Sequence, residues 1–305
     1  MQIPESAVKK LTNAGYRIVG THSAVSVCHW TKESLRNGRV CYKEKWYGKE
    51  GVKSHRCLEL TPSAVFCNQK CVFCWRSLKF TKSGEPKPDE PSAIIDGCIE
   101  ARKELIAGFG GREGTDRKKW EEAKKPTSAA ISLAGEPTMY PRISDLIGEF
   151  KRRNMTSFLV TNGTRPDRLE ALEHEPTNLY ISLCAPDEAT YKKVNRPSIA
   201  NGWKKLNESL ALIKSFDCRT VLRLTLVKGL NMHDAEKYAK LVRKYQPQVV
   251  EPKAFAWMGE ARERLGREGV PSMDEMRAFA KQISEKSGYE IADEDEASKV
   301  LMLKG

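Results

Sequence analysis

Three cysteines spaced Cys67-x3-Cys71-x2-Cys74, within the stretch FCNQKCVFCW, constrain this chain more than any other feature. Thiolates are the preferred ligands of iron-sulfur clusters. Three of them on one tight loop can hold three irons of a 4Fe-4S cube and leave the fourth iron open. The loop therefore predicts a cluster that can bind a further ligand.

This spacing resembles the signature of radical S-adenosylmethionine (SAM) enzymes. The resemblance implies that the open iron binds the amino and carboxylate groups of SAM, whose reductive cleavage gives a 5'-deoxyadenosyl radical. A structural zinc site would need a second cysteine or histidine pair, which the sequence does not show. Nine cysteines form an odd set, which disfavours a disulfide framework. Without a secretory or membrane-spanning segment, we expect a cytoplasmic protein.

Apolar, β-prone runs alternate with helical stretches downstream of the cysteines, which is typical of repeated βα units on a parallel sheet. The first strand is expected near residues 60–66, and the next five lie within 128–135, 157–163, 178–185, 220–229 and 248–257. Six units fall short of the eight in a complete barrel. We therefore predict an α/β fold, a partial (β/α)6 radical SAM barrel, with its chemistry at the carboxyl ends of the strands.

The predicted strand ends carry polar residues suited to SAM. Gly135, Glu136 and Pro137 close the second strand, where radical SAM enzymes keep a GGE-like motif that holds the methionyl ammonium. Thr161, Asn162 and Ser182 lie where the ribose hydroxyls are expected, although turn and core roles explain them equally well. Asn195-Arg196-Pro197, Arg223 or Lys228 could meet the SAM carboxylate.

A second cysteine set, Cys28, Cys41 and Cys57, precedes the barrel among Lys, Arg, His and Gly residues instead of apolar runs. Because core packing explains such a setting poorly, a second 4Fe-4S cluster with three protein ligands is the favoured interpretation. Cys98, Cys184 and Cys218 are expected to be core thiols. The predicted divisions are an N-terminal extension (1–59) with the auxiliary ligands, the barrel (60–257), and a C-terminal extension (258–305) packed on it.

A more specific resemblance follows. VCHWTKESLRNGRVCYKEKWYG and HRCLELTPSAVFCNQKCVFCWR, with the GEP, TNGT, LYISLCAPDEATYKKVNRP and LVKGLN segments, resemble the archaeal 4-demethylwyosine synthase family of tRNA-wybutosine biosynthesis. The resemblance matches Cys67, Cys71 and Cys74 to the SAM-cluster ligands. It matches Cys28, Cys41 and Cys57 to the auxiliary ones.

The family's reaction is a carbon-carbon lyase reaction on tRNA. N1-methylguanosine at position 37 of phenylalanine tRNA is condensed with two carbons of pyruvate, giving the tricyclic 4-demethylwyosine. Pyruvate could chelate the auxiliary cluster's open iron. Alternatively, Lys43, which matches the family's candidate lysine, could form a Schiff base with it. Since the flavodoxin-like domain of eukaryotic members is absent from this sequence, a separate electron-donor protein is expected, and the chain is expected to be a monomer.

Charge agrees with an RNA substrate. The chain has 52 basic and 40 acidic residues, a net charge of +12, and residues 1–60 hold 11 against 5. Trp30, Trp46, Tyr42 and Tyr47 among them are candidates for stacking on an extruded base, and residues 259–273 form a second candidate contact. Two alternatives are a radical SAM enzyme with an auxiliary cluster that acts on a non-RNA substrate, and a non-catalytic, zinc-holding RNA-binding protein.

Overall fold

The computed structural model describes residues 3–305, which form two compact units. Unit 1 contains the described part of Met1–Cys67 together with Gly84–Val160 and Ala171–Thr177. Unit 2 contains Asn68–Ser83, Thr161–Glu170 and Asn178–Gly305. The boundary passes through the cysteine loop, between Cys67 and Asn68.

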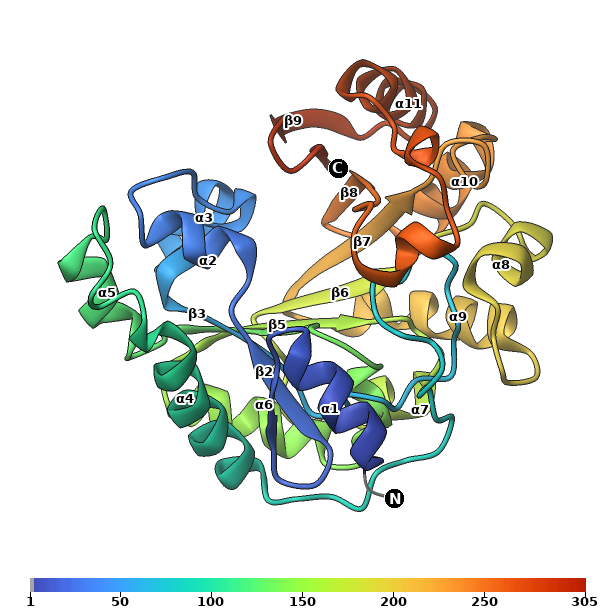
Figure 1. The fold of residues 1–305 in the computed structure, drawn as a ribbon. Coiled ribbons are helices and arrows are strands. Elements are labelled where there is room, and N and C mark those ends of the chain that lie inside the picture. The colour runs from blue at the N-terminus through green and yellow to red at the C-terminus, as the bar shows by residue number, and fades with distance from the viewer. Residues whose placement is uncertain (1–2) are drawn as a thin grey trace. The chain divides into compact units, whose positions relative to one another are not determined.

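Unit 1 is built on five neighbouring strands in chain order (Figure 1). They are β1 (Arg17–Val19), β2 (Ser23–Ser26), β3 (Cys57–Thr61), β4 (Ser128–Ile131) and β5 (Thr156–Thr161), whose last residue belongs to unit 2. β1, β2 and β3 pair antiparallel, whereas β3, β4 and β5 pair parallel. Every residue of β4 is buried, as expected for a parallel strand covered on both faces.

Helices cover these strands, and the longest is α4 (Pro91–Ala107), which packs on β1, β2, β3 and α6. Pro91 suits its first turn, where no backbone donor is needed. Gly97 permits close packing, because a Cβ there would lie 2.5 Å from Val19 Cγ1. The other helical segments are α1 (Glu5–Asn13), α2 (His29–Ser34), α3 (Tyr42–Tyr47), η1 (Gly48–Glu50), η2 (Ser54–Arg56), α5 (Arg117–Ala123), η3 (Pro137–Met139) and α6 (Ile143–Arg152).

Unit 2 contains three parallel strands, β6 (Asn178–Ser182), β7 (Arg219–Leu226) and β8 (Val249–Ala254). β10 (Val300–Lys304) pairs antiparallel with β8 and with β9 (Glu290–Asp295). Its α11 (Met273–Ser287) packs on α10, β8, β9 and β10. The remaining helical segments are α7 (Pro166–Glu170), α8 (Glu188–Asn195), α9 (Gly202–Ala211), η4 (Leu212–Ser215), α10 (Ala235–Tyr245), η5 (Gly259–Glu263) and η6 (Arg267–Gly269).

The six predicted parallel strands are confirmed as β3 to β8, three in each unit. β3 begins at Cys57, earlier than the expected start near residue 60. Sequence reasoning missed the antiparallel strands β1, β2, β9 and β10. β1 and β2 have only three and four residues, too few to show an alternating pattern.

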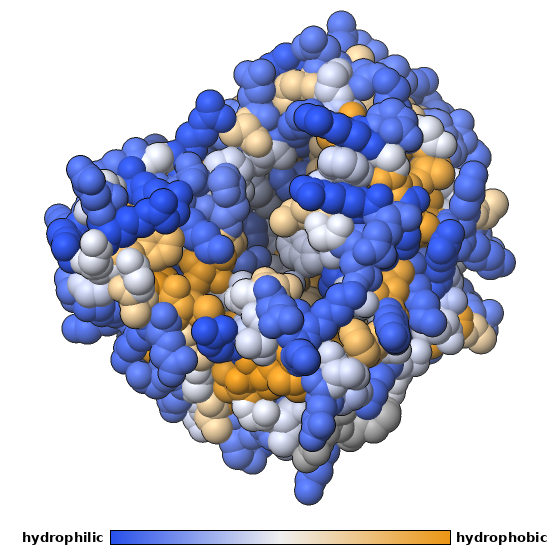
Figure 2. All heavy atoms as spheres, viewed as in Figure 1, coloured by the Kyte–Doolittle hydropathy of each residue, from blue (hydrophilic) through white to orange (hydrophobic). Residues whose placement is uncertain are grey.

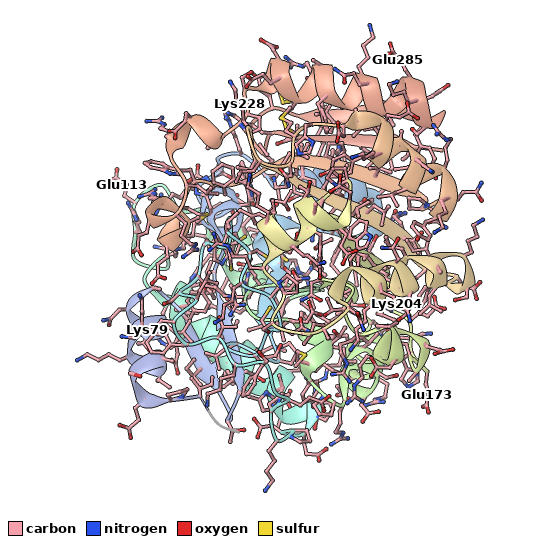
Figure 3. The ribbon with its side chains drawn as sticks, turned by 90° about the vertical axis from the view of Figure 1, so that its right-hand side faces the viewer. Lys79, Glu113, Glu173, Lys204, Lys228 and Glu285 are labelled. Carbon is pink, nitrogen blue, oxygen red and sulfur yellow. The ribbon has the colours of Figure 1, made fainter. Side chains whose placement is uncertain are left out.

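Charged side chains gather on the surface. In Figure 3 the labelled Lys79, Glu113, Lys204 and Glu285 project outward, and all four are exposed. Figure 2 shows mostly hydrophilic side chains over α5, α2 and α3 of unit 1. No helix among residues 3–305 is both long and apolar enough to cross a bilayer.

One buried histidine makes the stability of unit 1 sensitive to acid. His22 Nδ1 lies 2.6 Å from the Pro62 carbonyl, and its Nε2 lies 2.9 Å from the Asp89 N–H. The neutral ring therefore donates from Nδ1 and accepts at Nε2, and a further proton would face the Asp89 N–H. Burial accordingly lowers the pKa of His22, although the Asp89 carboxylate opposes that shift.

Because the unfolded chain takes up this proton more readily, the His22 contribution is complete above about pH 6.5 and declines below it. Urea titrations between pH 7.5 and 5 should show a falling free energy of unfolding. In His22→Asn the stability at pH 7.5 should drop by about 1–3 kcal/mol, and the acid slope should become shallower. Equal slopes in the two proteins would rule out His22 as the source.

Candidate functional site

The cysteine loop leaves unit 1 directly after β3. The Thr61 hydroxyl accepts from the Ser63 N–H at 3.1 Å and donates to the Ala134 carbonyl, which lies just beyond β4. The Phe66 N–H donates to the Ser63 carbonyl at 3.0 Å, which turns the chain toward Cys67, 6% exposed. The first predicted cluster ligand is thus held at the carboxyl end of a parallel strand, where chemistry was expected.

The Gly-Glu-Pro turn packs against this segment. Gly135 has φ +69°, and a Cβ there would lie 1.7 Å from the Ser63 carbonyl oxygen. The Glu136 N–H donates to the Phe66 carbonyl at 2.8 Å, while the Ser63 hydroxyl donates to the Glu136 carbonyl at 2.7 Å. Only glycine fits this approach. The turn is therefore fixed within unit 1 beside the residue that precedes Cys67.

The Glu136 carboxylate is buried, at 2% exposure. One of its oxygens accepts from both the Thr138 N–H (3.1 Å) and the Thr138 hydroxyl (2.7 Å), which caps the η3 turn that Pro137 begins. This carboxylate therefore has a structural role whether or not it also meets the SAM ammonium. The role of Gly135, Glu136 and Pro137 in SAM binding stays a prediction.

In unit 2, Cys71 and Cys74 lie on a segment held by the end of α8. The Val72 N–H donates to the Val194 carbonyl at 2.9 Å, and the Lys70 N–H donates to the Asn195 carbonyl at 3.1 Å. The Asn195 amide nitrogen lies 3.7 Å from Cys71 Sγ, within range of a hydrogen bond to sulfur. Asn195 therefore supports the cysteine loop, and its contact with the SAM carboxylate stays a prediction.

The segment 259–264 supports the same loop from another side. Arg264 Nε donates to the Val72 carbonyl at 3.1 Å, and its Nη2 donates to the Cys74 carbonyl. Gly259 allows close contact, because a Cβ there would lie 2.2 Å from the Trp75 carbonyl oxygen. This part of the expected phosphate-contacting segment 259–273 thus packs on the loop that follows the cluster ligands.

Asn162 and Thr161 mark the end of β5. The Asn162 amide donates to Asn68 Oδ1 at 2.9 Å and its oxygen accepts from the Thr164 N–H at 3.0 Å, while Thr161 is 1% exposed and accepts from the Gly163 N–H. Thr161 therefore shapes the turn. Ser182, at the end of β6, and Asn162 are half-buried. A ribose contact stays a prediction for both, as it does for Thr161.

Arg223 of β7 is engaged with a carboxylate on the adjacent strand. Its guanidinium makes a salt bridge of 2.5 Å with the fully buried Glu251 and lies 4.9 Å from the centre of the Tyr180 ring. The Tyr180 hydroxyl donates to the same carboxylate at 2.8 Å. Lys228, the other basic candidate on this segment, is exposed and pairs with Glu275.

Within unit 1, Ser54 joins the segments that carry the other three cysteines. The Cys41 N–H donates to the Ser54 hydroxyl at 2.8 Å, and the Thr31 hydroxyl donates to the Ser54 carbonyl at 2.8 Å. Cys28 caps α2 by accepting from the Thr31 N–H at 3.4 Å. Since Ser54 stands three residues before Cys57, one short turn connects all three segments.

Burial dominates the electrostatics here. It raises the pKa of Cys28 to about 12, with the negative charges of Glu59 and Cys57 adding to the effect. It also raises the pKa of the Cys57 thiol, which Lys43 opposes, and it raises the pKa of Glu59 to about 7 against the pull of Lys43 and Arg102. These thiols stay protonated until a metal displaces their protons.

Among residues 3–305, no three His, Cys, Asp or Glu side chains are gathered closely enough to ligate one metal ion. Cys28, Cys41 and Cys57 offer thiols, the ligand type that iron-sulfur clusters prefer, so a cluster on these three residues stays a prediction. Besides burial, the charge of Cys57 raises the pKa of Cys28, while Lys43 and Arg102 oppose the rise in the pKa of Cys57. Thiolates bound to a cluster here would therefore have two cations nearby.

Lys43 is distinguished from its neighbour by its surroundings. Its Nζ lies 4.2 Å from the centre of the Phe158 ring, and its side chain is half-buried, whereas Lys45 is exposed. Tyr42 and Tyr47 on the same helix are 5% and 3% exposed, so these two candidates for base stacking lie in the core. Of the four aromatic candidates, only Trp30 and Trp46 keep partial exposure.

Two family models match successive parts of the sequence: Radical SAM superfamily over residues 61–242, and Wyosine base formation over residues 244–304. The S-adenosyl-L-methionine-dependent tRNA 4-demethylwyosine synthase of Pyrococcus horikoshii is 46% identical, covering 99% of this chain and 89% of that protein. The Methanocaldococcus jannaschii enzyme of the same name is 35% identical, covering 99% and 96%.

Solved structures agree. A structure of TYW1 with a lysine-pyruvate adduct bound matches with a TM-score of 0.90 at 34% identity, covering 100% of this chain and 97% of that one. Archaeal TYW1 matches at 0.81 and 32% identity, covering 99% and 96%. The predicted α/β fold with a partial, open (β/α)6 barrel is thereby confirmed. Since these similarities extend over nearly the entire chain, it belongs to the tRNA 4-demethylwyosine synthase family of radical SAM enzymes.

Proposed function

We propose that this chain converts N1-methylguanosine at position 37 of phenylalanine tRNA into 4-demethylwyosine, using two carbons of pyruvate and releasing its carboxylate. The observation that carries this proposal is the 46% identity, over nearly full length, to proteins named tRNA 4-demethylwyosine synthase. The same relationship disfavours a radical SAM enzyme acting on a non-RNA substrate. SAM and one 4Fe-4S cluster follow from membership of the radical SAM superfamily.

We assign that SAM cluster to Cys67, Cys71 and Cys74. When bound, it and SAM supply the 5'-deoxyadenosyl radical. The chain's own contribution is positioning: the Ser63 and Phe66 carbonyls fix the Gly135 turn, while Asn195 and Arg264 fix the loop around Cys71 and Cys74. We expect Asn162 and Ser182 to meet the SAM ribose.

We assign a second 4Fe-4S cluster to Cys28, Cys41 and Cys57. Support comes from the Ser54 turn that connects their segments, and from the desolvation that raises the pKa of the Cys28 and Cys57 thiols and so disfavours free thiolates there. Cluster binding would displace the thiol protons and give the thiolates metal partners.

Pyruvate is proposed to form a Schiff base with Lys43. The amine adds to the ketone and a water molecule leaves, which fixes the carbonyl carbon next to the N-methyl group that loses its hydrogen. Two carbon atoms must approach to about 3–3.5 Å for the addition, and a covalent link restricts pyruvate to that position. The solved relative with a lysine-pyruvate adduct supports this choice over chelation by iron alone.

The remaining partners follow from charge and redox chemistry. A net charge of +12 attracts a phosphate backbone, and an external electron-donor protein would reduce the SAM cluster. We expect a monomer in the cytoplasm, a reducing compartment compatible with nine cysteines that form no disulfide among the described residues.

Nucleoside mass spectrometry tests the reaction directly. Reconstituted protein is incubated anaerobically with tRNA bearing N1-methylguanosine, SAM, a strong reductant and isotopically labelled pyruvate. We expect a new tricyclic nucleoside that carries two pyruvate carbons. Cleavage of SAM with unchanged tRNA would retain the radical chemistry and overturn the substrate assignment.

Replacing Lys43 distinguishes a covalent bond to pyruvate from electrostatic attraction of pyruvate by a positive charge. Lys43→Arg keeps the positive charge but removes the primary amine, so product formation should fall at least about 100-fold. Borohydride treatment with pyruvate should add the mass of the reduced adduct to the wild type and not to this variant. Lys45→Arg, the exposed neighbour, should match the wild type in both assays. If Lys43→Arg is equally active, pyruvate is held in another way.

Iron analysis tests the second cluster. Cys28→Ala should reduce the iron content after reconstitution from about eight to about four atoms per chain, while SAM cleavage continues. Cys98→Ala removes a fully buried thiol of α4 and serves as the control, with full iron expected. Full iron in Cys28→Ala would show that this thiol is not a ligand.

A further inference from the structure

Arg102 lies near the middle of α4, is 0% exposed, and is among the largest fully buried side chains. Burying a guanidinium is costly unless a carboxylate or another anion compensates its charge. The proposed radical chemistry gives this buried guanidinium no role, so its position needs another explanation.

The direct partners of Arg102 are all neutral. Its Nη2 donates to the His55 carbonyl at 2.7 Å, and its Nε donates to the Ala123 carbonyl at 3.1 Å. Within residues 3–305, Nη1 has no hydrogen-bond partner, and both acceptors of the guanidinium are backbone carbonyls, not carboxylates. The Nη1 group is thus a buried donor without an acceptor in the described part of the chain, and neither direct acceptor of the guanidinium carries a negative charge.

The ionisable groups that act on Arg102 from a distance are Cys57 and Cys28, two predicted ligands of the auxiliary cluster, and Glu59 on the same strand as Cys57. Burial lowers the pKa of Arg102, while Cys57, Cys28 and Glu59 raise it, in that order. The His55 carbonyl that Arg102 holds is two residues before Cys57. An arginine stays protonated at any ordinary pH, so its charge at this place is permanent.

We propose that Arg102 is the fixed countercharge of the auxiliary cluster, a positioning residue that offsets the negative charge of three thiolates and offers Nη1 as a donor to sulfur. The inference rests on the proposed second cluster. Hydrogen bonds to sulfur and nearby charge set the reduction potential of such clusters. A permanent cation stabilises the reduced, more negative state and so raises that potential.

The arginine on the SAM-cluster loop differs. Arg264 also donates to backbone carbonyls beside cysteine ligands, but its Nη1 lies 3.8 Å from the Glu260 carboxylate. A carboxylate thus lies beside the Arg264 charge within unit 2, whereas Glu59 acts on Arg102 only from a distance. The effect should therefore be specific to the auxiliary cluster.

The test uses the full chain with Cys67, Cys71 and Cys74 all changed to Ala, so that only the auxiliary cluster remains. Arg102→Gln removes the charge and retains a donor, and Arg102→Lys retains the charge with fewer donors. Arg153→Gln, whose arginine pairs with Asp96 and Glu149, is the matched control. Iron content, circular dichroism and a potentiometric titration followed by electron paramagnetic resonance are measured.

We expect the midpoint potential to become more negative in Arg102→Gln, to return most of the way in Arg102→Lys, and to be unchanged in Arg153→Gln. Folded Arg102→Gln protein that fails to retain iron, with retention in Arg102→Lys, would also support the countercharge. If Arg102→Gln keeps the midpoint potential of the parent protein, or if Arg102→Gln and Arg102→Lys shift it equally, the charge of Arg102 does not act on the cluster. Arg102 would then serve only to hold the His55 carbonyl. Absence of iron in the parent itself would overturn the second cluster, and this inference with it.

Discussion

The organisation of unit 1 depends on strand β3, five residues that begin with one predicted cluster ligand and lead to another. Cys57 is its first residue, and the chain beyond Thr61 turns through Ser63 and Phe66 to Cys67. Pairing with β2 on one side and β4 on the other fixes its register. Alternation along the strand places Cys57 and Glu59 on the same face. One predicted ligand of each cysteine set, Cys57 and Cys67, is thereby attached to the same rigid strand.

The charged side chains around Cys28 and Cys57 link the fold of unit 1 to the proposed chemistry. Free thiols at Cys28 and Cys57 are held protonated by burial, and Lys43 and Arg102 are the cations that oppose this effect at Cys57. Because the opposing charges come from two separate helices, α3 and α4, the site is assembled only when unit 1 is folded. The ligands thus become competent together with the lysine proposed to capture pyruvate.

Much of this was predictable from sequence, because cysteine spacing and apolar runs are local signals. The motif at Cys67, the six parallel strands and the core thiol Cys98 required no knowledge of tertiary contacts. The supporting residues could not be found in this way. Ser54 connects the Cys28 and Cys41 segments through a hydroxyl and a backbone carbonyl, and Arg264 reaches the Cys74 carbonyl across 190 positions of sequence. A polar residue in a loop carries no local signal of such a partner, and a buried arginine inside a helix such as α4 is not distinguishable from an exposed one.

The central claim is that one chain of this family holds two clusters on two separate cysteine sets. Anomalous diffraction at the iron edge, from crystals of anaerobically reconstituted protein, tests it most directly. We expect two iron peaks per chain, one bounded by Cys67, Cys71 and Cys74 and the other by Cys28, Cys41 and Cys57. A single iron peak at the first set, with ordered free thiols or a zinc-edge signal at the second, would contradict it.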